Sequence, residues 1–321
     1  MSFFPAPPDL VAKNYPQHVW FQPTEAPGMF GLGALGDAAS NLNDAIRKLE
    51  KAVKTSVDGY VGGYDVPMGF VNIYNAASDV QSLLYKKGIP TAGGWRDRAH
   101  KAAERIFEDA WDGVKKDKTA VEKVRRVGEM VPDMDELAAY AERLTGYKRI
   151  ESITPTLYAF YAKNMELAAK NMIWMAGRIE GDPTAWIQRL GTVSSKAQWT
   201  KWYKDWMYHV DAYLLPIPPT VPGWNRVFSS YRSIMKRAGD VAQSFADPGV
   251  AGRMLAALRE GILGLANMVD DAGKALWQWL KENFPNVVAA LTWLPWVGLG
   301  VAGVVLYSYF MAPKRLVTAR A

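Results

Sequence analysis

Histidines and paired carboxylates are the residues most often used for general acid–base catalysis, and this sequence holds few candidates. Its three histidines, His18, His100 and His209, lie far apart along the chain. None belongs to an H-E-x-x-H pattern, and neither a G-x-S-x-G nucleophile turn nor a G-x-x-x-x-G-K-[ST] loop is present. Asp270 and Asp271 are adjacent, so their side chains diverge on a helix. We therefore predict no catalytic or metal-binding residue, and a protein that is not an enzyme.

Two glycine-rich stretches match G-x-G-x-x-G, the pattern of a dinucleotide-binding turn: GLGALG at 31–36 and GLGVAG at 298–303. That pattern binds a phosphate only where a buried strand precedes it and a helix follows it. Residues 21–30 contain two prolines and a glycine and make a poor buried strand, while the second copy lies inside an apolar run. We predict no cofactor site, and we interpret the first copy as a hinge before a helix with Asp37 as N-cap.

The apolar run near the end of the sequence is long enough to cross a membrane. No side chain from Asn283 to Pro313 is charged, and residues 287–311 are almost wholly apolar. A bilayer core about 30 Å thick requires about 20 helical residues. Gly298 and Gly303 would let another helix approach closely. The residues expected at the two lipid headgroup layers are Trp293, Trp296, Tyr307, Tyr309, Lys314 and Arg315.

The overall composition favours a folded, basic protein. The chain has 321 residues, of which 49% are hydrophobic, so it can bury a substantial core. A formal net charge of +6 suits contact with anionic lipid or acidic partners. The absence of cysteine excludes disulfides and thiolate metal sites.

The hydrophobic pattern is helical, with glycine and proline between segments and no convincing alternation of strand type. We predict an all-α fold, with a multi-helix soluble domain and one C-terminal transmembrane helix. The early helices are expected near 37–58, 68–87, 95–127 and 133–146. The expected divisions are an extended Pro/Gly-rich arm at 1–36, a helical domain at 37–213, a Pro-rich linker at 214–223, a helical region at 224–286, the transmembrane helix at 287–311 and a basic tail at 312–321.

Residues 95–127 are densely charged and could be taken for a nucleic-acid-binding surface. They carry ten basic side chains but also seven acidic ones. Mixed charges at this density are typical of a solvated helix surface with local ion pairs. We therefore predict local ion pairs and no nucleic-acid partner.

Tryptophans and lysines alternate in a second unusual segment. Trp199, Trp202 and Trp206 are spaced three and four residues apart and share one side of a helix, with Lys196, Lys201 and Lys204 among them. Such a stripe forms a core seam between helices, a lipid-contacting surface or a surface for a partner. The sequence leaves these three interpretations open.

The segment from about 250 to 282 carries the most regular apolar pattern in the chain. Its repeat at alternating spacings of three and four predicts a seam against another helix, either within the same bundle or in a partner. The seam residues are Leu255, Leu258, Ile262, Leu265, Val269, Ala272, Leu276 and Trp279. Gly261, Ala266 and Gly273 beside the seam would let the two backbones approach closely.

Together these features predict a non-catalytic, membrane-anchored accessory subunit of a multi-subunit membrane complex. Its expected partners are other subunits and an anionic phospholipid such as cardiolipin, which favours a single-pass protein of the mitochondrial inner membrane in a respiratory complex or ATP synthase. One alternative is a membrane-associated virion or DNA-ejection protein. Another is a pore-forming or lytic protein, although that class needs a hydrophobic hairpin. The sequence does not decide which side of the membrane the large domain faces.

Overall fold

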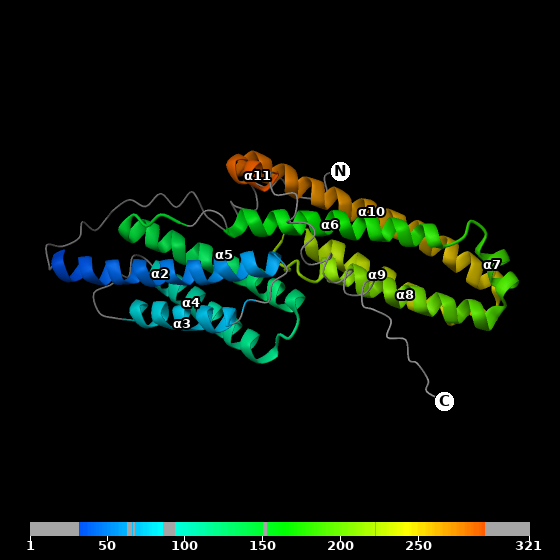
Figure 1. The fold of residues 1–321 in the computed structure, drawn as a ribbon, viewed down its shortest axis with the longest axis horizontal. Helices are drawn as coiled ribbons and strands as arrows, with labels where there is room; N and C mark the ends of the chain where they lie inside the picture. Colours follow the sequence, from blue (N-terminus) through cyan, green and yellow to red (C-terminus); the bar gives the residue numbers. More distant parts are fainter. Residues whose placement is uncertain are drawn as a thin grey trace, which may run out of the picture.

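The computed structural model describes residues 32–62, 66, 68–85, 94–149, 153–221 and 223–292. Every regular element in these ranges is a helix, which confirms the predicted all-α class. Figure 1 shows the helices arranged as two groups that follow each other along the long axis of the molecule. The first group contains α2 to α5, and the second contains α6 to α11.

The first group is a four-helix bundle. It consists of α2 (Leu32–Val61), α3 (Gly69–Leu84), α4 (Trp95–Lys116) and α5 (Ala120–Thr145). Each helix packs against the next, and α5 packs back against α2, so the four apolar sides meet in one core. In α2, Leu42, Ile46, Leu49 and Val53 are buried at the helical spacing that the sequence shows.

The boundary between α4 and α5 differs from the predicted one. We expected helices at 95–127 and 133–146, but α4 ends at Lys116 and α5 runs without a break through Pro132. The α5 helix begins where it does because Thr119 caps it: the Thr119 hydroxyl accepts from the Glu122 amide, and the Glu122 carboxylate accepts from the Thr119 amide. A proline inside a helix removes one hydrogen bond but does not always end it.

The second group is built around the longest helix. Its members are α6 (Ile153–Arg178), α7 (Pro183–Leu190), α8 (Thr192–Leu214), α9 (Trp224–Val241), the short 3-10 helix η2 (Ser244–Ala246), α10 (Pro248–Asn283) and α11 (Pro285–Thr292). α10 packs along α6 and also contacts α7 and α9, while α8 packs on α6 and α9. Asp182 and Asp247 cap α7 and α10, each followed by a proline in the first turn.

The two bundles meet where α6 contacts α2 and α5. The predicted linker at 214–223 reaches this region at Pro218, and its residues Ile217 and Val221 are buried. Pro218 lies close to Gly128 of α5 and Tyr161 of α6. We call this region the junction, defined by Gly128, Tyr158 and Tyr161, Pro218 and Trp279.

The predicted membrane location is corrected by the structure. Among the helices described here, none has both the length and the apolar character needed to cross a bilayer. The expectation of a single-pass protein of the mitochondrial inner membrane is therefore not retained. Only residues 287–292 of the expected span are described, and they belong to the eight-residue helix α11. The positions Trp293, Trp296, Gly298, Gly303, Tyr307, Tyr309, Lys314 and Arg315 lie outside the described residues, as does the arm at 1–31.

The first glycine-rich stretch lies at the start of a helix. Residues 32–36 form the first turns of α2, so this helix begins before Asp37, the N-cap that we expected. The expected hinge is corrected accordingly over 32–36. Helical backbone at these positions does not form the strand-to-helix turn that a dinucleotide phosphate requires.

Candidate functional site

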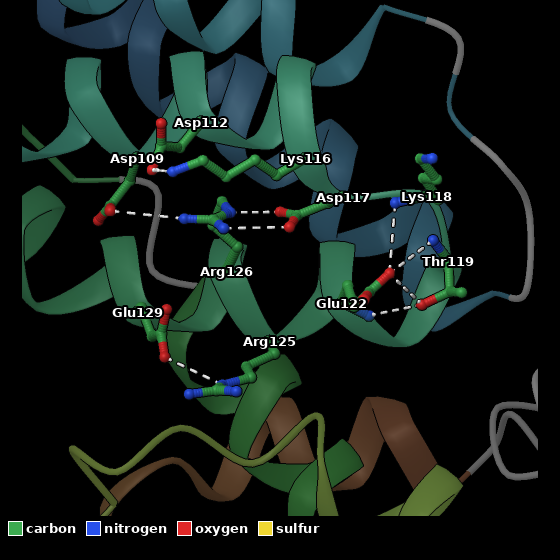
Figure 2. Close-up of polar contacts among 10 residues, drawn as sticks. All are labelled: Asp109, Asp112, Lys116, Asp117, Lys118, Thr119, Glu122, Arg125, Arg126 and Glu129. Atoms are coloured by element: carbon green, nitrogen blue, oxygen red, sulfur yellow. Dashed lines mark hydrogen bonds and ion pairs between the residues drawn. The ribbon is translucent and has the colours of Figure 1, made fainter.

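A dense group of charged side chains lies along the contact between α4 and α5. We call it the α4–α5 seam. Figure 2 shows Arg126 of α5 between two carboxylates, Asp109 of α4 and Asp117 of the turn that follows α4. The side chains meet because α4 and α5 pack against each other along their length and are joined by a short turn at 117–119.

Arg126 makes its stronger contact with Asp117. Its Nε donates to one Asp117 oxygen, and its Nη2 donates to Oδ1 over 3.0 Å, so the pair is bidentate. The Asp117 side chain is only 8% exposed, which limits screening by water. Asp109 is farther away, with 3.8 Å between Oδ1 and Arg126 Nη1.

Asp109 is the titratable group that this arrangement perturbs most clearly. Its partial burial raises the pKa from 3.8 to about 6, because the ionised form is poorly hydrated between the helices. Arg126 opposes this shift, while Glu129, Asp133 and Asp112 add to it. Asp109 therefore changes charge within the pH range of a cell, unlike an ordinary aspartate.

The surrounding carboxylates are held by cations or by backbone groups. Hydrogen bonds from Thr119 lower the pKa of Glu122. A hydrogen bond from Lys116 lowers the pKa of Asp112. At the other end of the seam, Arg105 of α4 donates to Asp133 of α5 from Nε over 2.9 and 3.1 Å. The Arg105–Asp133 pair joins the two helices and so helps to fix the relative position of α4 and α5.

The seam therefore has the character of a structural clamp that contains one titratable position. In the described residues, no group of three or more histidines, cysteines or acidic side chains is arranged to hold a metal ion. In Figure 2, Asp109, Asp112, Asp117 and Glu129 point at arginine or lysine side chains of the same seam, and Glu122 accepts hydrogen bonds at Thr119 instead. This engagement supports a role in holding the two helices rather than in reacting with a substrate.

The Asp109→Asn variant tests the pH dependence. Because the folded-state pKa of about 6 exceeds the ordinary value of 3.8, the folded protein retains a proton that the unfolded chain releases. The contribution of Asp109 to the free energy of unfolding therefore falls as the pH rises from about 4 to about 6, by about 1 kcal/mol once partial exposure is taken into account. We expect Asp109→Asn to remove this fall, as measured by thermal melts across that range.

Asp112→Asn is the matched control, one turn away on α4. The Asp112 pKa is lowered in the folded state, so this carboxylate stabilises the fold at neutral pH and loses that effect as the pH falls. Its replacement should change the pH profile in the opposite direction. Identical profiles for Asp109→Asn and the parent protein would show that Asp109 titrates normally.

A second charged region differs from the seam in the balance of its charges. α8 and α9 carry seven basic side chains and three acidic ones, whereas α4 and α5 carry ten and eleven. The two helices pack side by side, since Trp199 Nε1 donates to the Ala238 carbonyl over 2.9 Å. We call the outer side of this pair the α8–α9 surface. Within the described residues, none of its exposed cations lies in an ion pair. These cations are Lys196, Lys201, Lys204, Lys236 and Arg237.

The tryptophan stripe of α8 lies mostly inside the second bundle. Trp199 and Trp206 are 1% and 2% exposed. Trp202 is partly buried and stacks on Trp186 of α7, with 5.7 Å between ring centroids. In this structure the three side chains pack as a seam between helices. The burial of Trp199 and Trp206 leaves neither ring exposed for the lipid contact that we considered.

The seam of α10 is also buried within the chain, mainly against α6. The residues Leu255, Leu258, Ile262, Leu265, Val269, Ala272, Leu276 and Trp279 are all buried. Gly273 beside the seam allows close packing: a Cβ atom there would lie 3.0 Å from the Ala162 carbonyl oxygen and 3.0 Å from Met165 Cβ. The chain itself therefore supplies the helix that this pattern requires.

Sequence reasoning missed Asp109 and Arg126 as individual residues. A usable signal was present, because Asp109, Asp112 and Lys116 follow the three-and-four spacing that places charges on one side of a helix. The spacing does not reveal which carboxylate becomes buried, since that depends on the neighbouring helix.

No known protein family matches the chain, and neither does any curated protein or any solved structure.

Proposed function

We propose that the protein is a non-catalytic accessory subunit that holds other components of a multi-subunit assembly. The observation that carries this proposal is the α8–α9 surface. On α4 and α5, basic side chains are matched by carboxylates of the same chain, whereas α8 and α9 have an excess of four positive charges. Cations that lack a partner among the described residues are available to a partner outside the chain.

The chemistry of that partner follows from the surface. Tyr208 is 63% exposed and Val193 is 81% exposed, and both lie on the exposed side of α8 together with Lys201 and Lys204. A mixture of cations, an aromatic ring and an aliphatic side chain suits a protein surface with carboxylates around apolar groups. We therefore propose an acidic surface of another subunit as the partner.

The experiment compares two double charge reversals in the full chain. Lys201→Glu/Lys204→Glu changes the α8–α9 surface, and Lys48→Glu/Lys51→Glu makes the same change at the same spacing on exposed lysines of α2. Tagged proteins are purified from their native cells, and native mass spectrometry gives the composition of each assembly. We expect the α8 variant to retain roughly tenfold less of the partner subunits, with the α2 variant unchanged.

Changing the salt concentration, and testing lipid vesicles as a second probe, distinguish a charged protein partner from a lipid partner. Retention by the parent protein should fall as salt rises, because exposed charge pairs are screened. Equal retention by both variants would exclude the α8–α9 surface as the docking site. Binding of the parent protein to vesicles of anionic phospholipid, with no subunit retained, would replace the protein partner by a lipid one.

A further inference from the structure

The junction contains an unusually close approach of a side chain to a helix backbone. A Cβ atom placed on Gly128 would collide with the hydroxyl oxygen of Tyr161 and lie 3.4 Å from Pro218 Cγ. Glycine at position 128 therefore lets the phenol of α6 reach the backbone of α5 directly. This contact is one of the places where the second bundle rests on the first.

The backbone of α5 is altered at the same place. Pro132 lies inside α5, four residues after Gly128. In a regular helix the carbonyl of residue 128 would accept from the amide of residue 132, but proline has no N–H. The Gly128 carbonyl therefore lacks the backbone N–H donor that it would have in a regular helix. This gap lies in α5, the helix that Tyr161 contacts.

Several polar groups at and beside the junction are buried without a hydrogen-bond partner among the described residues. They are Tyr161 Oη and Asn164 Nδ2 on α6, and Trp279 Nε1 on α10. All three side chains are at most 5% exposed. Burying such groups unpaired is unfavourable, and native proteins leave few of them.

Within the second bundle, aromatic rings pack beside Tyr161. The ring of Tyr158 lies 5.6 Å from that of Trp279, and burial together with Asp135 raises the pKa of Tyr158 to about 12. Burial also raises the pKa of Tyr161, so both phenols stay protonated. Across the contact, Thr154 Oγ1 of α6 donates a long hydrogen bond of 3.5 Å to Asp135 Oδ2 of α5, while the Tyr161 hydroxyl at Gly128 is unsatisfied.

Each bundle has its own support away from the junction. Tyr147 donates to Glu50 of α2, and Arg149 pairs with Asp135 of α5, so the segment after α5 is fixed to the first bundle. In the second bundle, α6 is held by its long contact with α10. Separating the bundles at Gly128 and Tyr161 would leave both of these arrangements intact.

We infer that the junction is a releasable contact, through which the second bundle exchanges between the docked position shown in Figure 1 and one withdrawn from α5. In the withdrawn position, water reaches the hydroxyl group of Tyr161, the unsatisfied group that lies directly against α5. Docking recovers the apolar contact and loses that hydration. The two effects oppose each other, and the exchange changes the angle between the α8–α9 surface and the first bundle.

The test measures the distance between the bundles in the full chain. Because the sequence has no cysteine, Lys101→Cys on α4 and Asn267→Cys on α10 place two spin labels at exposed positions without removing native thiols. We expect two populations of distances by electron–electron double resonance. Tyr161→Phe removes one unsatisfied hydroxyl, so it should raise the ratio of docked to withdrawn molecules at least threefold. Gly128→Ala should shift this ratio the other way.

Tyr231→Phe is the matched control. Tyr231 is buried in the second bundle, and its hydroxyl donates to Asp211 over 2.8 Å, so the same substitution there removes a satisfied group. It should lower the melting temperature and leave the distances unchanged. A single distance in the parent protein that Tyr161→Phe does not alter would overturn the inference, as would an equal shift in Tyr231→Phe. Because Tyr161→Phe adds no atoms, misfolding of Gly128→Ala would not decide the outcome.

Discussion

Replacing Leu265 by aspartate should unfold the second bundle at neutral pH. Leu265 is buried on the side of α10 that packs along α6. The substitution removes apolar contacts and places a carboxylate where it has no partner, at a combined cost of about 4 kcal/mol or more. That loss is comparable to the whole stability of a typical domain. Urea unfolding followed by circular dichroism at pH 7.5 measures the loss.

Asn267→Asp is the control for this prediction. Asn267 is exposed on the same helix, two residues further along, so the same acidic group meets water there. Its unfolding midpoint should stay close to that of the parent protein. Limited proteolysis of Leu265→Asp should cut within 153–283 before it cuts the first bundle. Equal midpoints for the two variants would mean that α10 does not form the core seam.

The helices of this fold could be predicted well wherever an apolar pattern continues for several turns. The repeat in α10 is the clearest case, because its three-and-four spacing requires a neighbouring helix whatever the rest of the chain does. Periodicity does not say where that neighbour comes from. The structure shows that the neighbour is α6, because Gly273 packs on residues of α6 that lie more than a hundred positions earlier in the sequence.

The boundary of α5 shows a different limit. We expected one helix to end near 127 and the next to begin near 133, with Pro132 between them. The motif that decides the boundary lies upstream, where Thr119 and Glu122 satisfy each other's amides at the start of α5. That motif can be recognised in the sequence. Pro132 removes one backbone hydrogen bond from α5, and the helix continues because both of its halves pack against neighbouring helices.

The candidate site was the least predictable part. Mixed charges in 95–127 predicted local ion pairs, and the structure contains them. The sequence could not show that Arg126 pairs more closely with Asp117 than with Asp109, because this choice depends on the turn between two helices. The tryptophans of α8 show the same limit, since a core seam and a lipid surface require the same spacing.

Arg126→Ala should produce the largest loss of stability among single substitutions of ion-paired residues in the α4–α5 seam. The substitution leaves Asp117, which is almost wholly buried, without its bidentate partner, and it removes the cation nearest to Asp109. Breaking such a partly buried pair typically costs about 2–4 kcal/mol, mainly because a charge stays buried and unpaired. Urea unfolding at pH 7.5 measures the loss.

The pH dependence distinguishes loss of the ion pair from simple loss of packing. Without Arg126, the folded-state pKa of Asp109 rises further above its ordinary value of 3.8, since Arg126 is the group that lowers it. A carboxyl group with a raised folded-state pKa destabilises the protein above that pKa and ceases to do so as it is protonated. The difference between Arg126→Ala and the parent protein should therefore shrink as the pH falls from 7.5 towards 4.5.

Arg125 provides the control, because its pair with Glu129 joins residues one turn apart on the exposed side of α5, with 3.1 Å between the paired atoms. Arg125→Ala should change the free energy of unfolding by less than about 0.5 kcal/mol, as is usual for exposed pairs. Adding Asp117→Asn to Arg126→Ala should recover part of the lost stability, since the unpaired charge is then gone. Equal losses in Arg125→Ala and Arg126→Ala, at both pH values, would show that the α4–α5 seam does not clamp the two helices.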